Sequence, residues 1–172
     1  MRLLTAFFAL SLLPFTAGTL AAADNPTVNR LLDHWNKSKA YMLEIAGQMP
    51  PADYASRPNP EEMTFGQQMV HIANGTLFLV HDLAPKKQDL FDDKKADKES
   101  ALAALRTSFD AGAAALATLT DADLNTRIVD SGEGKMTALE AVLMTFDHVE
   151  HHRGQAIVYL RVKGIRPVDY RF

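Results

Sequence analysis

Four long segments of this chain carry apolar residues at the three- and four-residue spacing of an amphipathic helix, and no segment alternates like a strand. The segments cover approximately residues 27–49, 64–83, 98–119 and 137–162. Pro50 and Pro51 end the first, Pro85 stops the second, and Gly164 is a suitable C-terminal glycine for the last. Four helices of about 20 residues in a 172-residue chain predict an all-α fold, a four-helix bundle.

Capping residues support the predicted helix starts. Thr64 with Gln67, and Thr137 with Glu140, fit the capping box, in which a hydroxyl and a longer polar side chain satisfy free backbone N–H groups. Asp97 is placed to cap the third helix. The charged residues 86–97 are expected to connect the second and third helices. Residues 120–136 are expected to form a loop with one short helical turn at 121–124.

The first 23 residues have the features of a signal peptide. A short basic start at Arg2 precedes the apolar residues 3–13, and the small residues 21–23 offer a cleavage site near Ala23. The alternative is a retained membrane anchor, but the apolar run is broken by Pro14 and is short for a span of about 20 residues. We therefore expect a signal peptide at 1–23, a single domain at 24–172, a periplasmic or secreted protein, and no membrane attachment after cleavage.

The charge and the absence of cysteine exclude several classes of function. The formal net charge is −3, and no basic stretch of the kind that binds nucleic acid is present. The chain has no cysteine, which excludes disulfides, thiolate chemistry on the protein and covalent haem attachment. The sequence leaves open whether two copies form a homodimer.

Histidines at helical spacing are the candidate metal ligands. His148 and His152 lie one turn apart on the predicted helix at 137–162, so both imidazoles can reach one point in space. His71 lies in the middle of the second helix, with Gly75 one turn along, where a missing side chain clears space beside the imidazole. Three imidazoles from two helices would leave a coordination position open, as in catalytic metal sites.

Other interpretations of these histidines remain. His148 and His152 fit equally a pair at the core edge that hydrogen-bonds to other helices, and a b-type haem could use a histidine and one of the seven methionines. Two familiar metal patterns are excluded. The zinc-protease order His-Glu-x-x-His is absent because Glu150 is two residues from His148, and no glutamate has a histidine three residues on, as ferritin-like sites require.

The pattern resembles the DinB/YfiT-like superfamily. The resemblance rests on His71 in a helix, on His-Arg-Gly-Gln at 152–155 with a histidine four residues before it, and on Gly-Ile-Arg-Pro at 164–167. It covers essentially all of the chain after the leader. It implies a four-helix bundle of up-down-down-up order, and a divalent metal, zinc or nickel, held by His71, His148 and His152.

The resemblance also implies a function. Characterised members include thiol S-transferases, so the chain is expected to be a metal-dependent transferase or hydrolase for a small molecule such as a thiol. The alternative is a non-catalytic metal-binding or carrier bundle. Gln155 and Tyr159 are expected to orient a ligand histidine or a bound water; for Tyr159, packing at the core edge is an equal alternative. Arg153 is expected to be structural and paired with an acid on a neighbouring helix. Three histidines are not expected to be ligands: His34, His81 and His151.

Overall fold

The computed structural model describes residues 25–86, 88–130 and 134–170. It is mostly helical. The long helices are α1 (Pro26–Gln48), α2 (Phe65–Val80), α3 (Lys98–Leu116) and α5 (Ala138–Val162). The short elements are η1 (Pro51–Asp53), α4 (Asp123–Thr126), β1 (Ile128–Asp130) and β2 (Lys135–Thr137). The predicted signal peptide, residues 1–23, lies outside the described residues.

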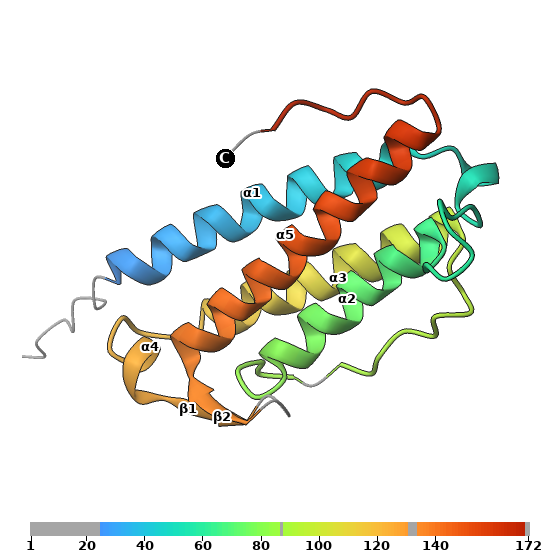
Figure 1. The fold of residues 1–172 in the computed structure, drawn as a ribbon. Coiled ribbons are helices and arrows are strands. Elements are labelled where there is room, and N and C mark those ends of the chain that lie inside the picture. The colour runs from blue at the N-terminus through green and yellow to red at the C-terminus, as the bar shows by residue number, and fades with distance from the viewer. Residues whose placement is uncertain (1–24, 87, 131–133, 171–172) are drawn as a thin grey trace, which may run out of the picture.

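The long helices lie side by side as a bundle, with α1 and α5 running in one direction and α2 and α3 in the other (Figure 1). Helix α3 packs between α1 and α2, and α2 packs on α5. Residues 81–86 and 88–97 lie along the length of the bundle, so that α3 can run parallel to α2. This is the up-down-down-up order that the resemblance implied. Within the described part of the chain, none of the helices has the length and apolar character needed to span a membrane.

The predicted helix starts are confirmed at atomic detail. Both capping boxes are complete: the side chains of Thr64 and Thr137 accept hydrogen bonds from the backbone N–H groups of Gln67 and Glu140, whose own side chains bond back to the caps. The side chain of Asp97 accepts from two backbone N–H groups at the start of α3. Local sequence therefore sets where α2, α3 and α5 begin, and with them the height of each side chain along the bundle.

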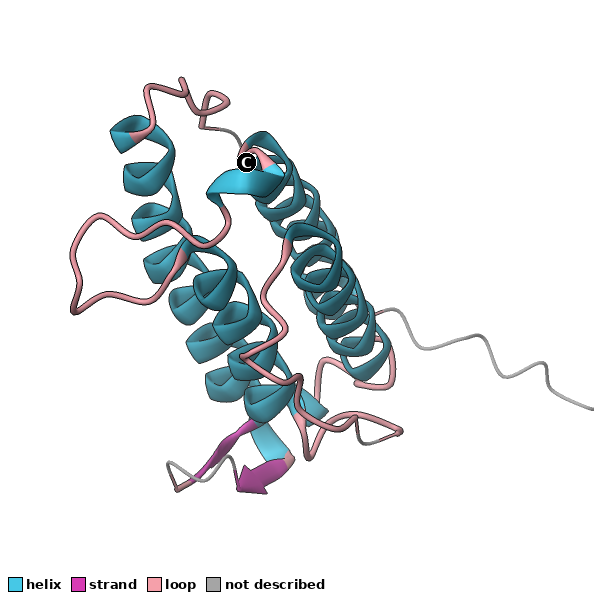
Figure 2. Cartoon of the chain, turned by 90° about the vertical axis from the view of Figure 1, so that its right-hand side faces the viewer, coloured by secondary structure: helices cyan, strands magenta, loops and turns pink. Residues whose placement is uncertain are grey.

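The prediction that no segment is a strand was wrong between α4 and α5. Strands β1 and β2 pair antiparallel there, with Val129 opposite Met136. Each strand has three residues, which is too short for an alternating pattern to stand out in the sequence. Figures 1 and 2 show this hairpin at the end of the bundle where α2 ends and α5 begins.

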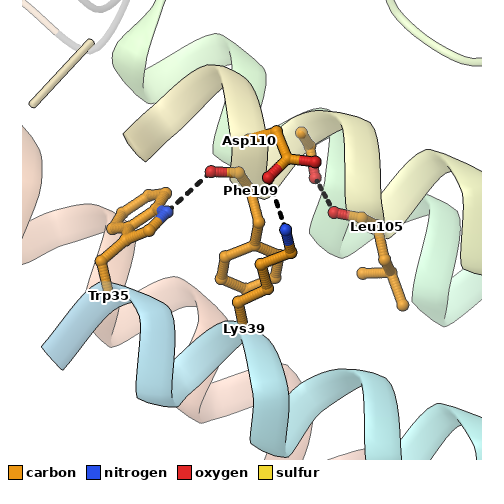
Figure 3. A network of polar contacts seen from close by, with 6 residues as sticks. Trp35, Lys39, Leu105, Phe109 and Asp110 are labelled. Atoms are coloured by element: carbon orange, nitrogen blue, oxygen red, sulfur yellow. Dashed lines mark hydrogen bonds and ion pairs between the residues drawn. The ribbon is translucent and has the colours of Figure 1, made fainter. Parts of the chain in front are cut away.

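The core between α1 and α3 is organised around Trp35, which is fully buried. Its indole Nε1 donates a hydrogen bond to the carbonyl of Phe109 at 2.8 Å, and Lys39 forms an ion pair with Asp110 one turn away (Figure 3). A Cβ at Gly112 would lie 2.1 Å from the indole ring, so any residue other than glycine at this position would clash with Trp35. This contact holds α1 against α3, on the side of the bundle away from the α2–α5 face that carries the three histidines.

Candidate metal centre

The three predicted ligands converge between α2 and α5. His71 Nε2 lies 3.1 Å from His152 Nε2 and 3.3 Å from His148 Nε2. One nitrogen from each of the three rings lies within 4.8 Å of the other two, an arrangement that could hold a metal ion. His152 is buried, His148 half-buried and His71 exposed, so the cluster lies at the edge of the bundle with one side toward solvent.

The spacing of these nitrogens fits a tetrahedral ion. Zinc–imidazole bonds of about 2.0–2.1 Å at tetrahedral angles separate neighbouring nitrogens by about 3.3–3.4 Å. The observed separations at His71, 3.1 and 3.3 Å, are close to this value. Three lone pairs that face one another would need protons between them or a shared cation, and a cation satisfies all three at once.

A glycine on α2 makes room for the half-buried ring. A Cβ on Gly75 would lie 2.2 Å from Cε1 and 2.6 Å from Nε2 of His148. The sequence pattern had suggested that Gly75 clears space beside His71, its neighbour on the same helix. The space is in fact occupied by His148 from the facing helix.

The environment keeps the histidines neutral. Burial, together with the neighbouring histidines, lowers the pKa of His148 to about 4. Burial and His71 lower the pKa of His152 to about 4, against a hydrogen bond from Gln155 that raises it. Burial also lowers the pKa of His71. Imidazole must be neutral to bind a metal, so the site is ready for an ion at neutral pH without losing protons.

These pKa values predict an acid-sensitive metal-free protein. In the unfolded chain, His148 and His152 take up protons near pH 6.5, but the folded protein takes them up only near pH 4. The free energy of unfolding should therefore be highest above about pH 6.5 and fall between pH 6.5 and 4, where the unfolded state binds more protons. We expect thermal unfolding with chelator present to shift by on the order of 5 °C across this window. The His148→Gln, His152→Gln double variant should show a much flatter profile; equal slopes would contradict the assignment.

Two amides contact the outer nitrogen of His152. Gln155 Oε1 lies 3.0 Å from His152 Nδ1, and Gln68 Nε2 lies 2.6 Å from the same atom. Gln68 Nε2 also donates to Gln155 Oε1, and Gln155 Nε2 lies 3.1 Å from His151 Nε2. An amide oxygen only accepts hydrogen bonds and an amide nitrogen only donates, so the two glutamines call for opposite tautomers of His152: Gln155 Oε1 for a proton on Nδ1, and Gln68 Nε2 for a lone pair there. A metal on Nε2 requires the tautomer with its proton on Nδ1, which Gln155 can satisfy. That tautomer leaves the lone pair of Nε2 facing the other two histidines.

Gln155 therefore lies where the sequence predicted, but Gln68 was missed. The signal for Gln68 was its place three residues before His71, on the same face of α2. We expect Gln155→Ala to weaken zinc binding by about ten- to a hundredfold, as the loss of such partners of ligand histidines usually does. Competition with a chromophoric chelator measures this. Gln67→Ala is the control, because Gln67 is the glutamine next to Gln68 and belongs to the α2 cap. It should destabilise the helix start but leave zinc affinity unchanged.

The structure places Tyr159 away from the histidines. Its hydroxyl donates to the carbonyl of Met63 at 2.7 Å, and its ring packs near Phe65 at the start of α2. Arg153 is buried, as expected of a structural residue, and the acid that pairs with it here comes from its own helix. It pairs with Glu150 of its own helix and lies over the ring of Tyr41 in α1. A pair three residues apart on one helix needs no acid from another element.

The other histidines lie outside the three-ring cluster. His34 packs edge-on against Phe146, and His81 contacts Asp82. His151 approaches the site from its rim, through Gln155 and the neighbouring ring of His152. None of the three belongs to the group that could share an ion, which is consistent with their exclusion on sequence grounds.

A pocket of about 440 Å³ adjoins the cluster. His71 and His148 form part of its wall, so both rings face the cluster on one side and the pocket on the other. The other lining residues come from α2, α5 and the segment after α2: Asn74, Gly75, Phe78, Leu79, Leu90 and Met144. A volume of this size is typical of sites for small molecules.

Fold and site together define a small helical bundle with a three-histidine cluster beside a pocket. The family model of the DinB superfamily matches residues 34–156, and the chain belongs to this superfamily. All three histidines lie in the matched region.

Solved structures share the fold. The chain is similar to a DinB-like protein from Bacillus cereus, with a TM-score of 0.74 and 20% identity over 83% of this chain and 97% of that one. A DinB-like protein from Bacillus subtilis gives a TM-score of 0.64 and 19% identity over 83% and 96% of the two chains. A conserved protein from Enterococcus faecalis gives 0.61 and 15% over 79% and 96%. No curated protein matches the sequence.

Proposed function

We propose that this protein is a metal-dependent enzyme that acts on a small molecule, with His71, His148 and His152 as ligands of a divalent ion. The observation that supports catalysis is the pocket of about 440 Å³ that shares His71 and His148 with the cluster. A carrier or storage bundle needs only the ligands. A pocket beside an incomplete set of three ligands gives a second molecule access to the ion.

Zinc or nickel is the ion we propose, because the resemblance to the superfamily implies one of them; imidazole nitrogens suit both, as they also suit copper and iron. Such an ion would lower the pKa of a coordinated water or thiol and so supply a nucleophile near neutral pH. The chain's own residues bring the three rings together, and Gln155 Oε1 can accept from His152 Nδ1–H in the tautomer that metal binding at Nε2 requires. Hydrolysis and thiol transfer both remain within this chemistry.

We further propose that the protein works in the periplasm or is secreted, on the basis of its first 23 residues. That location favours hydrolysis, because low-molecular-weight thiols are kept reduced mainly in the cytoplasm. The partner is a small molecule and not nucleic acid, since the net charge is −3 and no basic stretch is present.

A substrate screen on defined metal forms tests the proposal. The full chain is stripped with chelator, reloaded with zinc or nickel, and assayed for ester and amide hydrolysis and for thiol addition to electrophiles. We expect turnover that is abolished by chelation and restored by reloading. His148→Ala should lack this activity, and His34→Ala should retain it. Stoichiometric metal without turnover on any substrate class would favour the carrier, and a protein that binds no metal would overturn both functions.

A further inference from the structure

The pocket beside the histidines has a wall that is almost entirely apolar. We propose that it selects a neutral, largely apolar molecule that presents one polar donor atom to the histidine cluster. This inference rests on the proposed function and specifies its substrate class. It follows from what each wall of the pocket can offer a ligand.

The body of the pocket consists of hydrocarbon and thioether groups. Phe78 and Leu79 line it from α2, Met144 from α5 and Leu90 from the segment after α2. Phe78 is 44% exposed and Leu90 61% exposed, so both keep apolar surface in contact with water at the mouth. A ligand with an apolar body would remove this surface from water, which is the main source of affinity in such a pocket.

The one polar side chain besides the histidines is already engaged. Asn74 Nδ2 donates to the carbonyl of Phe91 at 3.0 Å, and Asn74 Oδ1 accepts from the N–H of Phe91 at 2.8 Å. The two bonds use one N–H and one lone pair of the amide and hold the neighbouring Leu90 over the pocket. A ligand therefore finds its polar contacts chiefly at His71 and His148, with the remaining N–H and lone pair of Asn74 beside them, and apolar contacts elsewhere.

Away from the ion, a charged group has no partner in this pocket. None of the lining residues is an acid, a lysine or an arginine, so a charge on the body of the ligand would lose its hydration without compensation. Only the atom that reaches the ion can carry negative charge. A second cavity, of about 340 Å³, lies on the far side of Phe78 and Leu90, which line both. It contains Asp89 and Asp130, whose charges disfavour an anion at that end of the site. Polar, charged thiols fit this surface poorly.

A series of alkyl hydroxamates on the zinc-loaded full chain tests the inference. The hydroxamate end binds zinc, and the chain length varies from acetohydroxamate through hexanohydroxamate to octanohydroxamate. We expect calorimetry to show about a two- to fourfold gain in affinity for each added methylene group, the range expected for partial to full burial. A terminal carboxylate on the longest chain should remove most of this gain. Equal affinity for all chain lengths, or no loss with the carboxylate, would overturn the proposal.

A matched pair of variants locates the effect. Leu90→Asp places a charge at the pocket mouth, and Leu143→Asp places the same charge on α5 at a residue that is 48% exposed and does not line the pocket. Both side chains are exposed, so both variants should fold, and each is loaded with zinc to the same occupancy before the hydroxamates are compared. The gain with chain length should disappear in Leu90→Asp and persist in Leu143→Asp. A similar response in both variants would contradict the proposed site.

A measurement without metal tests the selectivity of the pocket separately from the proposed metal-dependent function. Metal-free protein labelled at the methionine methyl groups is titrated with 1-octanol and with octanoate, and the Met144 signal is assigned with Met144→Leu. We expect the Met144 signal to shift with the alcohol and not with the anion, whether or not the protein binds zinc. A protein that binds no zinc would overturn the proposed function but not the apolar pocket. Zinc binding without a Met144 response, and without chain-length dependence, would overturn the pocket's proposed selectivity alone.

Discussion

His152→Ala should reduce zinc binding by on the order of a hundred- to a thousandfold while the helices stay folded. A structural zinc contributes about 10–16 kcal/mol over its four ligands, and one ligand therefore accounts for roughly a quarter of this. His152 is the most buried of the three rings, and its Nε2 lies 3.1 Å from that of His71. Its loss removes a ligand and leaves the amides of Gln68 and Gln155 without the ring between them.

Elemental analysis after gel filtration, with chelator competition for the affinity, measures the effect. Circular dichroism establishes that the variant is helical. His34→Ala is the matched control, because His34 lies on α1 against Phe146 and outside the cluster. If His152→Ala retains as much metal as the wild type, the ion is not held by these three histidines.

Gly75→Ala should also cost most of the metal affinity, by about a hundredfold, although it changes no ligand. The added methyl group would lie within 2.2–2.9 Å of three atoms of the His148 ring, and real carbon atoms do not approach so closely. His148 is a side chain and can rotate away, so we expect the clash to displace the ligand more than to unfold the bundle. Alanine also raises helix propensity by up to about 1 kcal/mol over glycine, which offsets part of the strain.

Two further variants test this explanation. Gly154→Ala in α5 adds a methyl group with no atom within 4 Å; we expect it to leave zinc affinity unchanged and to stabilise the protein by about 0.5–1 kcal/mol. In a His148→Ala background the clash disappears, so Gly75→Ala should have no further effect on metal binding there. Additive effects of the two changes would show that Gly75 acts by another route.

Sequence patterns predicted those features that depend on residues close together in the chain. The caps at Thr64 and Thr137 need only three neighbouring positions, and the four long helices follow from a repeating apolar pattern. Strands of three residues carry too few positions for such a pattern, so the hairpin at Val129 and Met136 was missed. Helix ends in general came within a few residues of the prediction.

The missed parts of the site depend on contacts that local spacing does not encode. Gln68 and His152 are 84 residues apart, and Asn74 and Phe91 are 17 apart. Gln67 and Gln68 lie four and three residues before His71, so helical spacing places both near it, and only the contact with α5 shows that Gln68 is the one that reaches His152. The three histidines could be grouped because helix geometry and the resemblance constrained them together, whereas the pocket depends on how residues 88–96 lie across α2.

The hydrogen bonds between Asn74 and Phe91 join two parts of the site that tolerate substitution differently: the helices that carry the histidines, and the connecting segment that carries Leu90. The rings that converge between α2 and α5 belong to rigid helices, and any shift there would disturb all three at once. Leu90 belongs to a connecting segment that meets this wall through one amide and one peptide unit. Replacements in that segment, at Leu90 above all, would therefore change which molecules the pocket admits, over evolution or by design, while the three imidazoles keep their arrangement on α2 and α5.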